Sequence, residues 1–381
     1  DWSSDVCSSD LLESCLRSAW MQDFFDFEII VVSDASHGRD QKGRSAKKIV
    51  KASQKESDRW RIQKALPPIL IRFIEHKENR GLIEVRRTLM FNAHGFYITQ
   101  LDSDDELETG ALKALYSAAK ISSNPKNSSG EKDGFQTWQI DRLQILQNPQ
   151  SFFDIVHGTS RSGTFDETGN FIPTAVNRYG KIFYGTITSR EIFRCWLIEG
   201  SFTANTWGKL IKRELYLAAY ENIPYTECNM ADDILLFFFL SQKAMSYKGI
   251  EEKVYRYRVN TGMSSSRKID TLGKWRMICS TASVFSIISQ WIESAGSEYS
   301  EDIEDIKARD GEGANNSFFL REDEVRFIRQ MTSSYLANNL KQMKETVIPE
   351  LQEEARKMLC DYWGEGFVKK IESLNGNVNE V

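Results

Sequence analysis

The sequence predicts an α/β fold in which a mostly parallel sheet is flanked by helices and followed by a C-terminal α-helical region. The short β-branched run at residues 27–32 has the length and composition of a strand buried on both faces, and residues 68–74 form the next expected strand. Segments with helical spacing of apolar residues alternate with these runs, which makes a right-handed strand–helix–strand crossover the expected connection. After residue 267 the pattern changes to amphipathic helices.

The first half of the chain supplies one strand–helix–strand unit after another. Residues 37–66 are rich in Lys, Arg and Ser and predict a solvated helix and loop between the first two strands. Gly81 then opens a helix with one apolar face, and Gly95 suits its end before a strand at residues 96–101. The apolar face of that helix consists of Leu82, Val85, Leu89 and Ala93.

The second half is less regular. A helix is expected at residues 108–120 and a polar, Gly/Ser/Pro-bearing loop at residues 122–134. Alternating strand-like pieces up to residue 194 carry no pattern that indicates chemistry. The C-terminal region shows apolar stripes at helical spacing, which are signals of core packing. The clearest stripe consists of Leu272, Trp275, Ile278, Ala282 and Phe285.

Four acids follow the strand at residues 96–101 almost without interruption: Asp102, Asp104, Asp105 and Glu106, with only Ser103 among them. Carboxylates this dense repel one another unless a cation lies between them, and oxygen ligands favour a hard divalent ion such as Mg²⁺ or Mn²⁺. The alternative is an acidic, solvated turn that caps the next helix, because Asp is common in turns and at helix starts.

The residues around these acids resemble the family 2, GT-A-type glycosyltransferases. Gly81 and Leu82 match the start of the family pattern, Arg86 matches its arginine, and the later Ala-x-Gly-x-Tyr-Ile and Leu-Asp-x-Asp-Asp motifs are both present. Arg87 stands where the family usually has Asn. The resemblance implies a GT-A fold in which Asp104, helped by Asp102, binds the cation.

The same resemblance implies a nucleotide-sugar site formed by Asp34, Arg86, Asp102 and Ser103. Asp34 follows the first strand, and ligands of open α/β sheets bind beyond the carboxyl ends of strands. The family pattern at this point is Val-Asp-Asp-Gly-Ser, from which Ser33 and Ala35 depart. An Asx turn leaving a strand is the structural alternative for Asp34.

A second motif lies at residues 206–215, where Trp-x-Lys-Leu precedes the pair Asp232 and Asp233 at a predicted helix start. The resemblance implies that Asp233, with Asp232 as the second candidate, is the general base of a single displacement with inversion. The alternative is helix capping, since a helix N-terminus stabilises a carboxylate. The segment 253–266 resembles the close of the catalytic domain, and Asn260 stands where many relatives carry His.

The function implied is transfer of a sugar from a nucleotide-diphosphate donor, with a UDP-sugar expected, to a hydroxyl of a glycan or lipid-linked acceptor in cell-surface polysaccharide synthesis. Residues 1–10 have no Met and no signal-peptide pattern, and the family's first strand is missing after them, so we expect a non-native leader. Residues 11–267 are then the GT-A domain without its first strand, and residues 268–381 an accessory helical domain.

Composition excludes several classes of protein. A net charge of −5 with no Lys/Arg cluster interleaved with aromatic residues argues against nucleic acid as a partner. The apolar run at residues 234–240 is far shorter than the roughly 20 residues of a membrane-spanning helix, so we expect no such helix. The 6 cysteines form no Cys-x-x-Cys pair. We therefore expect reduced thiols and a cytoplasmic protein, with peripheral association at the inner face of the membrane left open.

Two other functions remain open on the sequence. One is a non-catalytic relative that binds a nucleotide or a glycan. The missing first strand and the Asn260 departure are the reasons for considering it. The other is a nucleotidyltransferase, which also uses metal-bound acids on an α/β sheet but usually needs a Gly-rich, basic phosphate loop. A glycosyltransferase would release nucleoside diphosphate, whereas a nucleotidyltransferase would release pyrophosphate.

Overall fold

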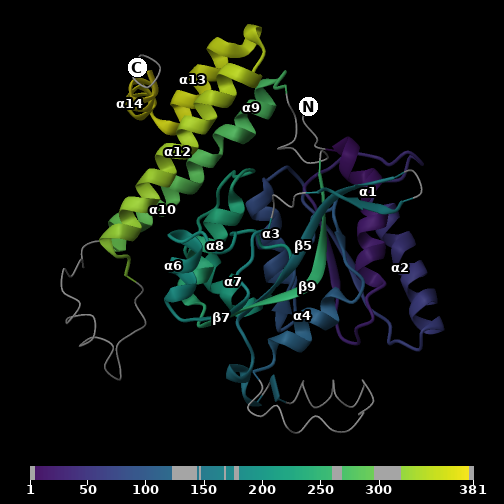
Figure 1. Cartoon of the computed structure of the whole chain (residues 1–381). Coiled ribbons are helices and arrows are strands. Elements are labelled where there is room, and N and C mark those ends of the chain that lie inside the picture. Colours follow the sequence, from purple (N-terminus) through teal and green to yellow (C-terminus); the bar gives the residue numbers. More distant parts are fainter. Residues whose placement is uncertain are drawn as a thin grey trace, which may run out of the picture.

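The computed structural model confirms the α/β class (Figure 1). It describes residues 5–121, 144–145, 147–166, 169–175, 180–259, 268–295 and 319–376. Sheets and flanking helices form the body of the molecule, and the C-terminal helices extend from one end of it. The predicted loop at residues 122–134 and the predicted boundary at residue 267 both lie outside the described residues.

The N-terminal part is a two-stranded parallel sheet covered by helices. Strands β1 and β2 pair in parallel from Ile29↔Ile71 to Ser33↔Glu75. An apolar cluster that includes Leu12, Trp20 and Ile49 joins the helices α1 and α2 to this sheet. The elements here are α1 (Asp5–Trp20), β1 (Ile29–Ser33), α2 (Ala46–Gln63), β2 (Ile71–Glu75) and α3 (Leu82–Asn92).

The expected burial of the first strand on both faces is wrong. Residues 29–32 of β1 are only half-buried, and Ser33 alone is buried. The strand pairs with β2 on one side and, within the described chain, with no strand on the other. A strand in the middle of a larger sheet would have neighbours on both sides.

The second sheet has seven strands in the order β3-β8-β5-β9-β4, with β6 beside β5 and β7 beside β9. Here the expectation of mostly parallel pairing needs correction, because only β5 and β9 run in parallel and the other neighbours are antiparallel. Apolar runs show where strands occur but not the direction of their partners. The strands are β3 (Tyr97–Ile98), β4 (Glu106–Leu107), β5 (Ile155–Phe165), β6 (Phe171–Pro173), β7 (Gly185–Thr188), β8 (Lys209–Lys212) and β9 (Ser246–Arg258).

Helix α8 (Asp232–Lys243) forms the centre of the main core. All six residues from Leu235 to Leu240 are at most 2% exposed, because α8 is covered on every side. Its neighbours include the C-terminal helices, whose Phe285 and Ile328 belong to the same apolar cluster. The other helices of the body are α4 (Ala111–Ala119), α6 (Glu191–Leu197) and α7 (Arg213–Tyr220), with a 3₁₀ turn at Pro149–Ser151.

The C-terminal helices have a second core of their own around Trp275, Leu340 and Leu359. They are also tied to the body by Glu324, which is fully buried and pairs with Arg190 at 2.5 Å and Arg194 at 3.1 Å. None of the described helices combines the length and apolar character needed to cross a bilayer. The elements are α9 (Leu272–Cys279), α10 (Thr281–Ala295), α12 (Glu322–Thr346), a 3₁₀ turn at Pro349–Leu351, α13 (Gln352–Trp363) and α14 (Glu365–Gly376).

Candidate functional site

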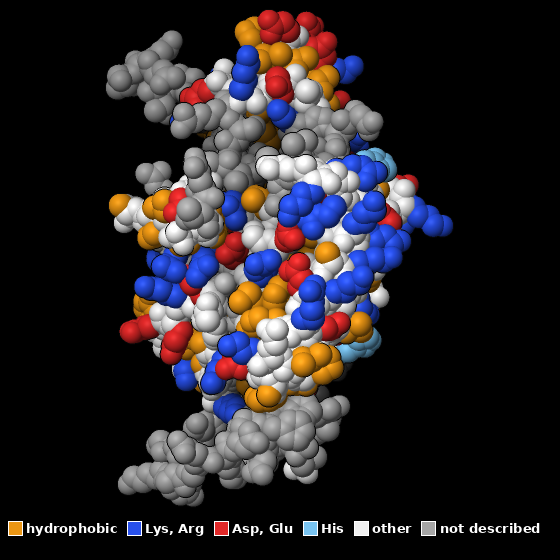
Figure 2. Space-filling model, turned by 90° about the vertical axis from the view of Figure 1, so that its right-hand side faces the viewer, with side chains coloured by type: hydrophobic (Ala, Val, Ile, Leu, Met, Phe, Trp, Pro, Cys, Tyr) orange, Lys and Arg blue, Asp and Glu red, His pale blue; other side chains and the backbone are white. Residues whose placement is uncertain are grey.

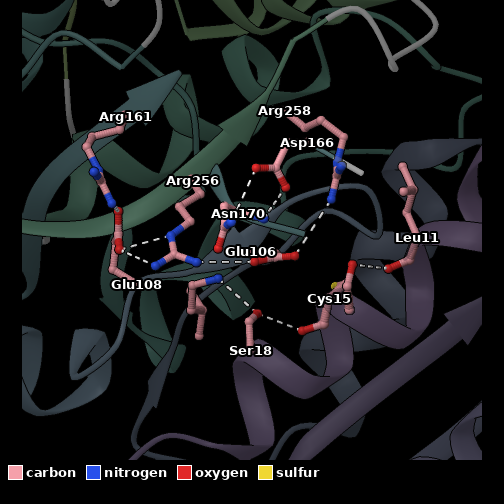
Figure 3. A network of polar contacts seen from close by, with 12 residues as sticks. Leu11, Cys15, Ser18, Glu106, Glu108, Arg161, Asp166, Asn170, Arg256 and Arg258 are labelled. Atoms are coloured by element: carbon pink, nitrogen blue, oxygen red, sulfur yellow. Dashed lines mark hydrogen bonds and ion pairs between the residues drawn. The ribbon is translucent and has the colours of Figure 1, made fainter. Parts of the chain in front are cut away.

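The acidic loop that follows β3 is held from two sides. On one side Ser18 of α1 accepts a hydrogen bond from the Leu107 backbone N–H at 3.0 Å. On the other side the Tyr255 hydroxyl of β9 accepts the Asp102 backbone N–H at 3.2 Å. Figure 3 shows α1 below this loop and the β9 arginines above it. The loop conformation is thus fixed by residues far from it in the sequence.

The structure divides the four acids into two pairs. Asp105 is 1% exposed and accepts hydrogen bonds from the Tyr255 hydroxyl at 2.8 Å and the Arg258 N–H at 2.6 Å. Burial, together with repulsion from Asp104 and Asp102, raises the pKa of Asp105 to about 8. A carboxyl group that is buried and accepts two hydrogen bonds inside the protein is a poor cation ligand. Asp105 therefore supports the loop instead of lining the site.

Glu106 also points into the protein, where the arginines of β9 neutralise it (Figure 3). It lies 3.4 Å from Arg256 and 3.7 Å from Arg258. Arg256 further pairs with Glu108 at 2.9 Å, and Arg161 joins the same carboxylate. Arg256 and Arg258 therefore both pair with acids of the protein itself.

Asp102 and Asp104 remain as the pair suited to a cation. The Asp102 side chain is 36% exposed, and Ser103 between the two acids is exposed. Burial raises the pKa of Asp102, and the neighbouring Asp104 raises it further, although Arg86 opposes both effects. A divalent cation would relieve this repulsion. Carboxylate oxygens are the kind of ligand that Mg²⁺ uses in proteins.

Arg86, on α3, connects the acidic loop to the start of α8. Its guanidinium donates to Asp232 at 2.5 Å and lies 3.7 Å from Asp102, and it also donates to Gln100. Arg86 is 7% exposed. Burial opposes its charge, but the two carboxylates hold its pKa above the usual value. Arg86 therefore binds protein side chains and fixes the two acidic segments relative to each other.

Asp233 lies next to this ion pair but is not part of it. Its carboxylate accepts the Ile234 backbone N–H at 2.9 Å, and its side chain is half-buried. Burial and the neighbouring Asp232 raise the pKa of Asp233 to about 6, while Arg86 and Lys209 act in the opposite direction. Of the two adjacent acids, Asp232 is bound in a salt bridge and Asp233 has the pKa of a usable base.

Backbone strain occurs beside two of the candidate acids. Ala231, immediately before Asp232, has a φ of 60°, and Ala35, immediately after Asp34, has a φ of 58°. A non-glycine residue in this left-handed region costs free energy, and such residues cluster at functional sites. The sequence marked Ala35 only as a departure from the family pattern, and it predicted neither of these backbone conformations.

Asp34 has a different environment from the one expected of a nucleotide contact. Its carboxylate accepts the backbone N–H groups of Arg80 at 3.0 Å and Gly81 at 2.9 Å, and it contacts His76 at 2.6 Å. These bonds fasten the segment before α3 to the end of β1. Both oxygens of Asp34 are thus already engaged by the protein.

Sequence reasoning missed Lys209 and Tyr255. Lys209, inside the Trp-x-Lys-Leu motif, is fully buried, donates to the Thr203 carbonyl at 2.9 Å and lies over the Phe237 ring at 5.6 Å. Burial lowers its pKa well below the usual value, although Asp233 opposes this. Trp207 of the same motif stacks on Tyr255 with ring centroids 4.7 Å apart. The motif was visible in the sequence, but its burial was not.

Further polar residues have partners of their own or lie outside the described chain. Asp154 pairs with Lys212 at 2.7 Å, and His157 is buried against Tyr247. Asn260 lies outside the described residues. Among the parts of the chain that are described, one group of three side chains has ligand atoms within 4.8 Å of one another, and it lies apart from the acidic loop. That group is Glu191, Cys195 and Glu199.

Comparisons with known proteins find similarity to glycosyltransferases over parts of the chain. Residues 7–125 match the family model described as Glycosyl transferase family 2. Over 109 residues the chain is 33% identical to the GalNAc(5)-diNAcBac-PP-undecaprenol beta-1,3-glucosyltransferase of Campylobacter jejuni, an overlap of 29% of this chain and 30% of the relative. Over 262 residues it is 24% identical to Glycosyltransferase GlyA of Streptococcus pneumoniae, which covers 67% of this chain and 29% of the relative.

The chain thus spans about 30% of the length of these curated relatives. Among solved structures, the crystal structure of S. aureus TarS 1-349 in complex with UDP-GlcNAc overlaps 97% of this chain and 90% of that one. The sequence identity is 14% and the TM-score is 0.39.

Proposed function

We propose that this protein transfers a sugar from a nucleotide-diphosphate donor to an acceptor hydroxyl, because residues 7–125 match the family model described as Glycosyl transferase family 2. The observation that carries the proposal is the bridge made by Arg86 between Asp102 and Asp232, which brings the acidic loop and the start of α8 together. A glycosyl transfer needs both parts: one to bind the donor diphosphate and one to accept the proton of the acceptor.

At the donor side, Asp104 and Asp102 would hold a divalent cation, Mn²⁺ or Mg²⁺, and Ser103 lies exposed between them. When bound, the cation neutralises the charge that develops on the leaving diphosphate. The proposed donor is a UDP-sugar, as the family resemblance implies. Asp34 would act through the segment that it fastens, because its oxygens already bind the backbone of Arg80 and Gly81.

At the acceptor side, Asp233 would remove the proton from the attacking hydroxyl. Its pKa of about 6 keeps it ionised at neutral pH yet close enough to that pH to accept a proton. A base on the face opposite the leaving group gives inversion at the anomeric carbon. Asp232 would have a positioning function through Arg86.

The acceptor class is proposed to be a glycan or a lipid-linked glycan in cell-surface polysaccharide synthesis. The Campylobacter jejuni relative bears a name that specifies a PP-undecaprenol-linked substrate, which supports a lipid-linked acceptor for this chain. That the helices after residue 267 form an accessory domain stays a prediction.

A panel of nucleotide sugars tests the proposal. The protein is incubated with each donor, with Mn²⁺ or Mg²⁺ and with undecaprenyl-diphosphate-linked glycans as acceptors, and the released nucleotide is identified. Nucleoside diphosphate released only when acceptor is present, and lost in Asp233→Asn, is the expected result. Release of pyrophosphate would indicate a nucleotidyltransferase, and donor binding without any release would indicate a binding protein.

A further inference from the structure

The outer surface of α2 carries a row of basic side chains. Lys48, Lys51, Lys55 and Arg59 are all exposed, and their spacing of three to four residues places them along one face of the helix. We call these four residues the α2 basic stripe. Figure 2 shows Lys and Arg side chains gathered over the side of the molecule on which α1 and α2 lie.

The charge of this segment differs sharply from that of the whole chain. Residues 37–64 contain ten Lys and Arg against three Asp and Glu, a formal net charge of +7, whereas the chain as a whole has −5. Part of this charge is used internally: Arg44 pairs with Glu13 at 2.7 Å, and Arg61 is buried. Across the described residues, Lys48, Lys51 and Lys55 form no ion pair. Their charge therefore faces solvent.

Large apolar side chains are exposed next to the stripe. Ile62, one turn beyond Arg59 on α2, is 76% exposed, and Leu70, just before β2, is 57% exposed. Leu70 also lines a groove of about 740 Å³ formed by residues of α2 and of the β2 region, and Lys51 and Lys55 line the same groove. Exposed apolar groups beside unpaired cations are the features of a surface that rests on a lipid headgroup layer.

We propose that the α2 basic stripe, with Ile62 and Leu70, docks this protein on a bilayer containing anionic phospholipids. A bilayer fits better than a nucleic acid, because acyl chains give Ile62 and Leu70 an apolar environment that a phosphodiester backbone does not offer. The proposal is independent of sugar transfer and is tested without a donor or acceptor.

Co-sedimentation with vesicles of phosphatidylcholine, with or without phosphatidylglycerol, measures the binding. Each lysine near an anionic surface contributes about 1 kcal/mol, which is roughly a fivefold change in partition coefficient. The triple variant Lys48→Ala, Lys51→Ala, Lys55→Ala should therefore lose about 100-fold in binding to the anionic vesicles. Binding of the parent protein should weaken as salt is added.

The matched control removes three exposed lysines from the C-terminal helices, namely Lys344→Ala, Lys357→Ala and Lys370→Ala. It changes the net charge by the same amount and should retain parental binding. Ile62→Ser should weaken vesicle binding while leaving its salt dependence unchanged. Thermal unfolding of all variants checks that each one is folded.

Four results would overturn the proposal. Equal losses in the two triple variants would mean that only overall charge matters. Equal binding to vesicles without phosphatidylglycerol, or no vesicle binding by the parent, would remove the anionic bilayer as the partner. A single-stranded oligonucleotide that displaces vesicles completely, combined with parental binding by Ile62→Ser, would identify a general polyanion surface instead.

Discussion

Replacing Asp233 by Asn should stabilise the protein while it removes the activity. Asn has the same shape and can still accept the Ile234 N–H, but it has no charge to bury. If Asp233 were only a helix cap, the change would be close to neutral, because Asn caps a helix about as well as Asp. The two interpretations of Asp233 therefore predict different changes in the free energy of unfolding: an increase for a buried charged base and little change for a cap.

The magnitude follows from the pKa of Asp233, which burial and Asp232 raise from 3.8 to about 6. The folded state then binds the proton more tightly than the unfolded state, so stability falls as the pH rises from about 4 to about 6. Each pKa unit corresponds to about 1.4 kcal/mol. Ionised Asp233 thus costs about 3 kcal/mol at pH 8 but only about 0.5 kcal/mol at pH 4.

Denaturant unfolding of the parent and of Asp233→Asn, at pH values from 4 to 8, measures this cost. The stability advantage of the variant should grow by about 2.5 kcal/mol across that range. Turnover of the parent should rise with pH up to about pH 6, and turnover of the variant should be lower by roughly 100-fold or more. Donor binding with Mn²⁺ should be retained.

The adjacent acid is the matched control. Asp232→Asn removes the charged partner of the buried Arg86, so it should lower stability by about 3 kcal/mol instead of raising it. The reasoning fails if Asp233→Asn has a stability difference from the parent that does not vary with pH. It also fails if that variant transfers sugar at the parental rate.

Three further changes test the neighbouring groups. Asp104→Ala should keep the fold but abolish the Mn²⁺ dependence of nucleotide binding measured by calorimetry, and an unchanged dependence would refute its metal function. Arg86→Ala leaves two acids without their cation and should lower the free energy of unfolding by about 3–5 kcal/mol; a surface-like change below about 1 kcal/mol would contradict the bridge. Lys209→Met removes a positive charge that lowers the pKa of Asp233, so the rising limb of the pH–rate profile should move to higher pH. If the position of this limb does not change, Lys209 has no effect on the pKa of the base.

Much of the fold could be predicted because local patterns determine where helices and strands form. The helix after Gly81 was expected from its apolar spacing and is observed at Leu82–Asn92. The burial of β1 was not predictable, since it depends on which strands become neighbours. The direction of strand pairing in the larger sheet was not predictable for the same reason. Strand β8 lies between β3 and β5, which are distant from it in the sequence.

The candidate site shows the same limit. The acids at 102–106 were found at once because they are adjacent in the sequence. The division of these acids into a buried pair and a pair suited to a cation was not predictable. Asp105 is buried because it binds the hydroxyl of Tyr255, which is 150 residues away in the sequence. The link between Arg86 and Asp232 spans 146 residues. Each of the two was recognised in its own motif, but only the fold shows that they bind each other.

The apolar core shared by α8 and the C-terminal helices has a practical consequence for dissecting this protein. Phe238 and Phe239 on α8 both pack against Trp291 of α10, with ring centroids 5.5 Å and 5.9 Å apart. A fragment that ends near residue 267 would leave these rings in water and invite aggregation. We expect limited proteolysis to yield no stable N-terminal product of that size. The helix that carries Asp233 and the helices beyond residue 267 should therefore be expressed together and should unfold together.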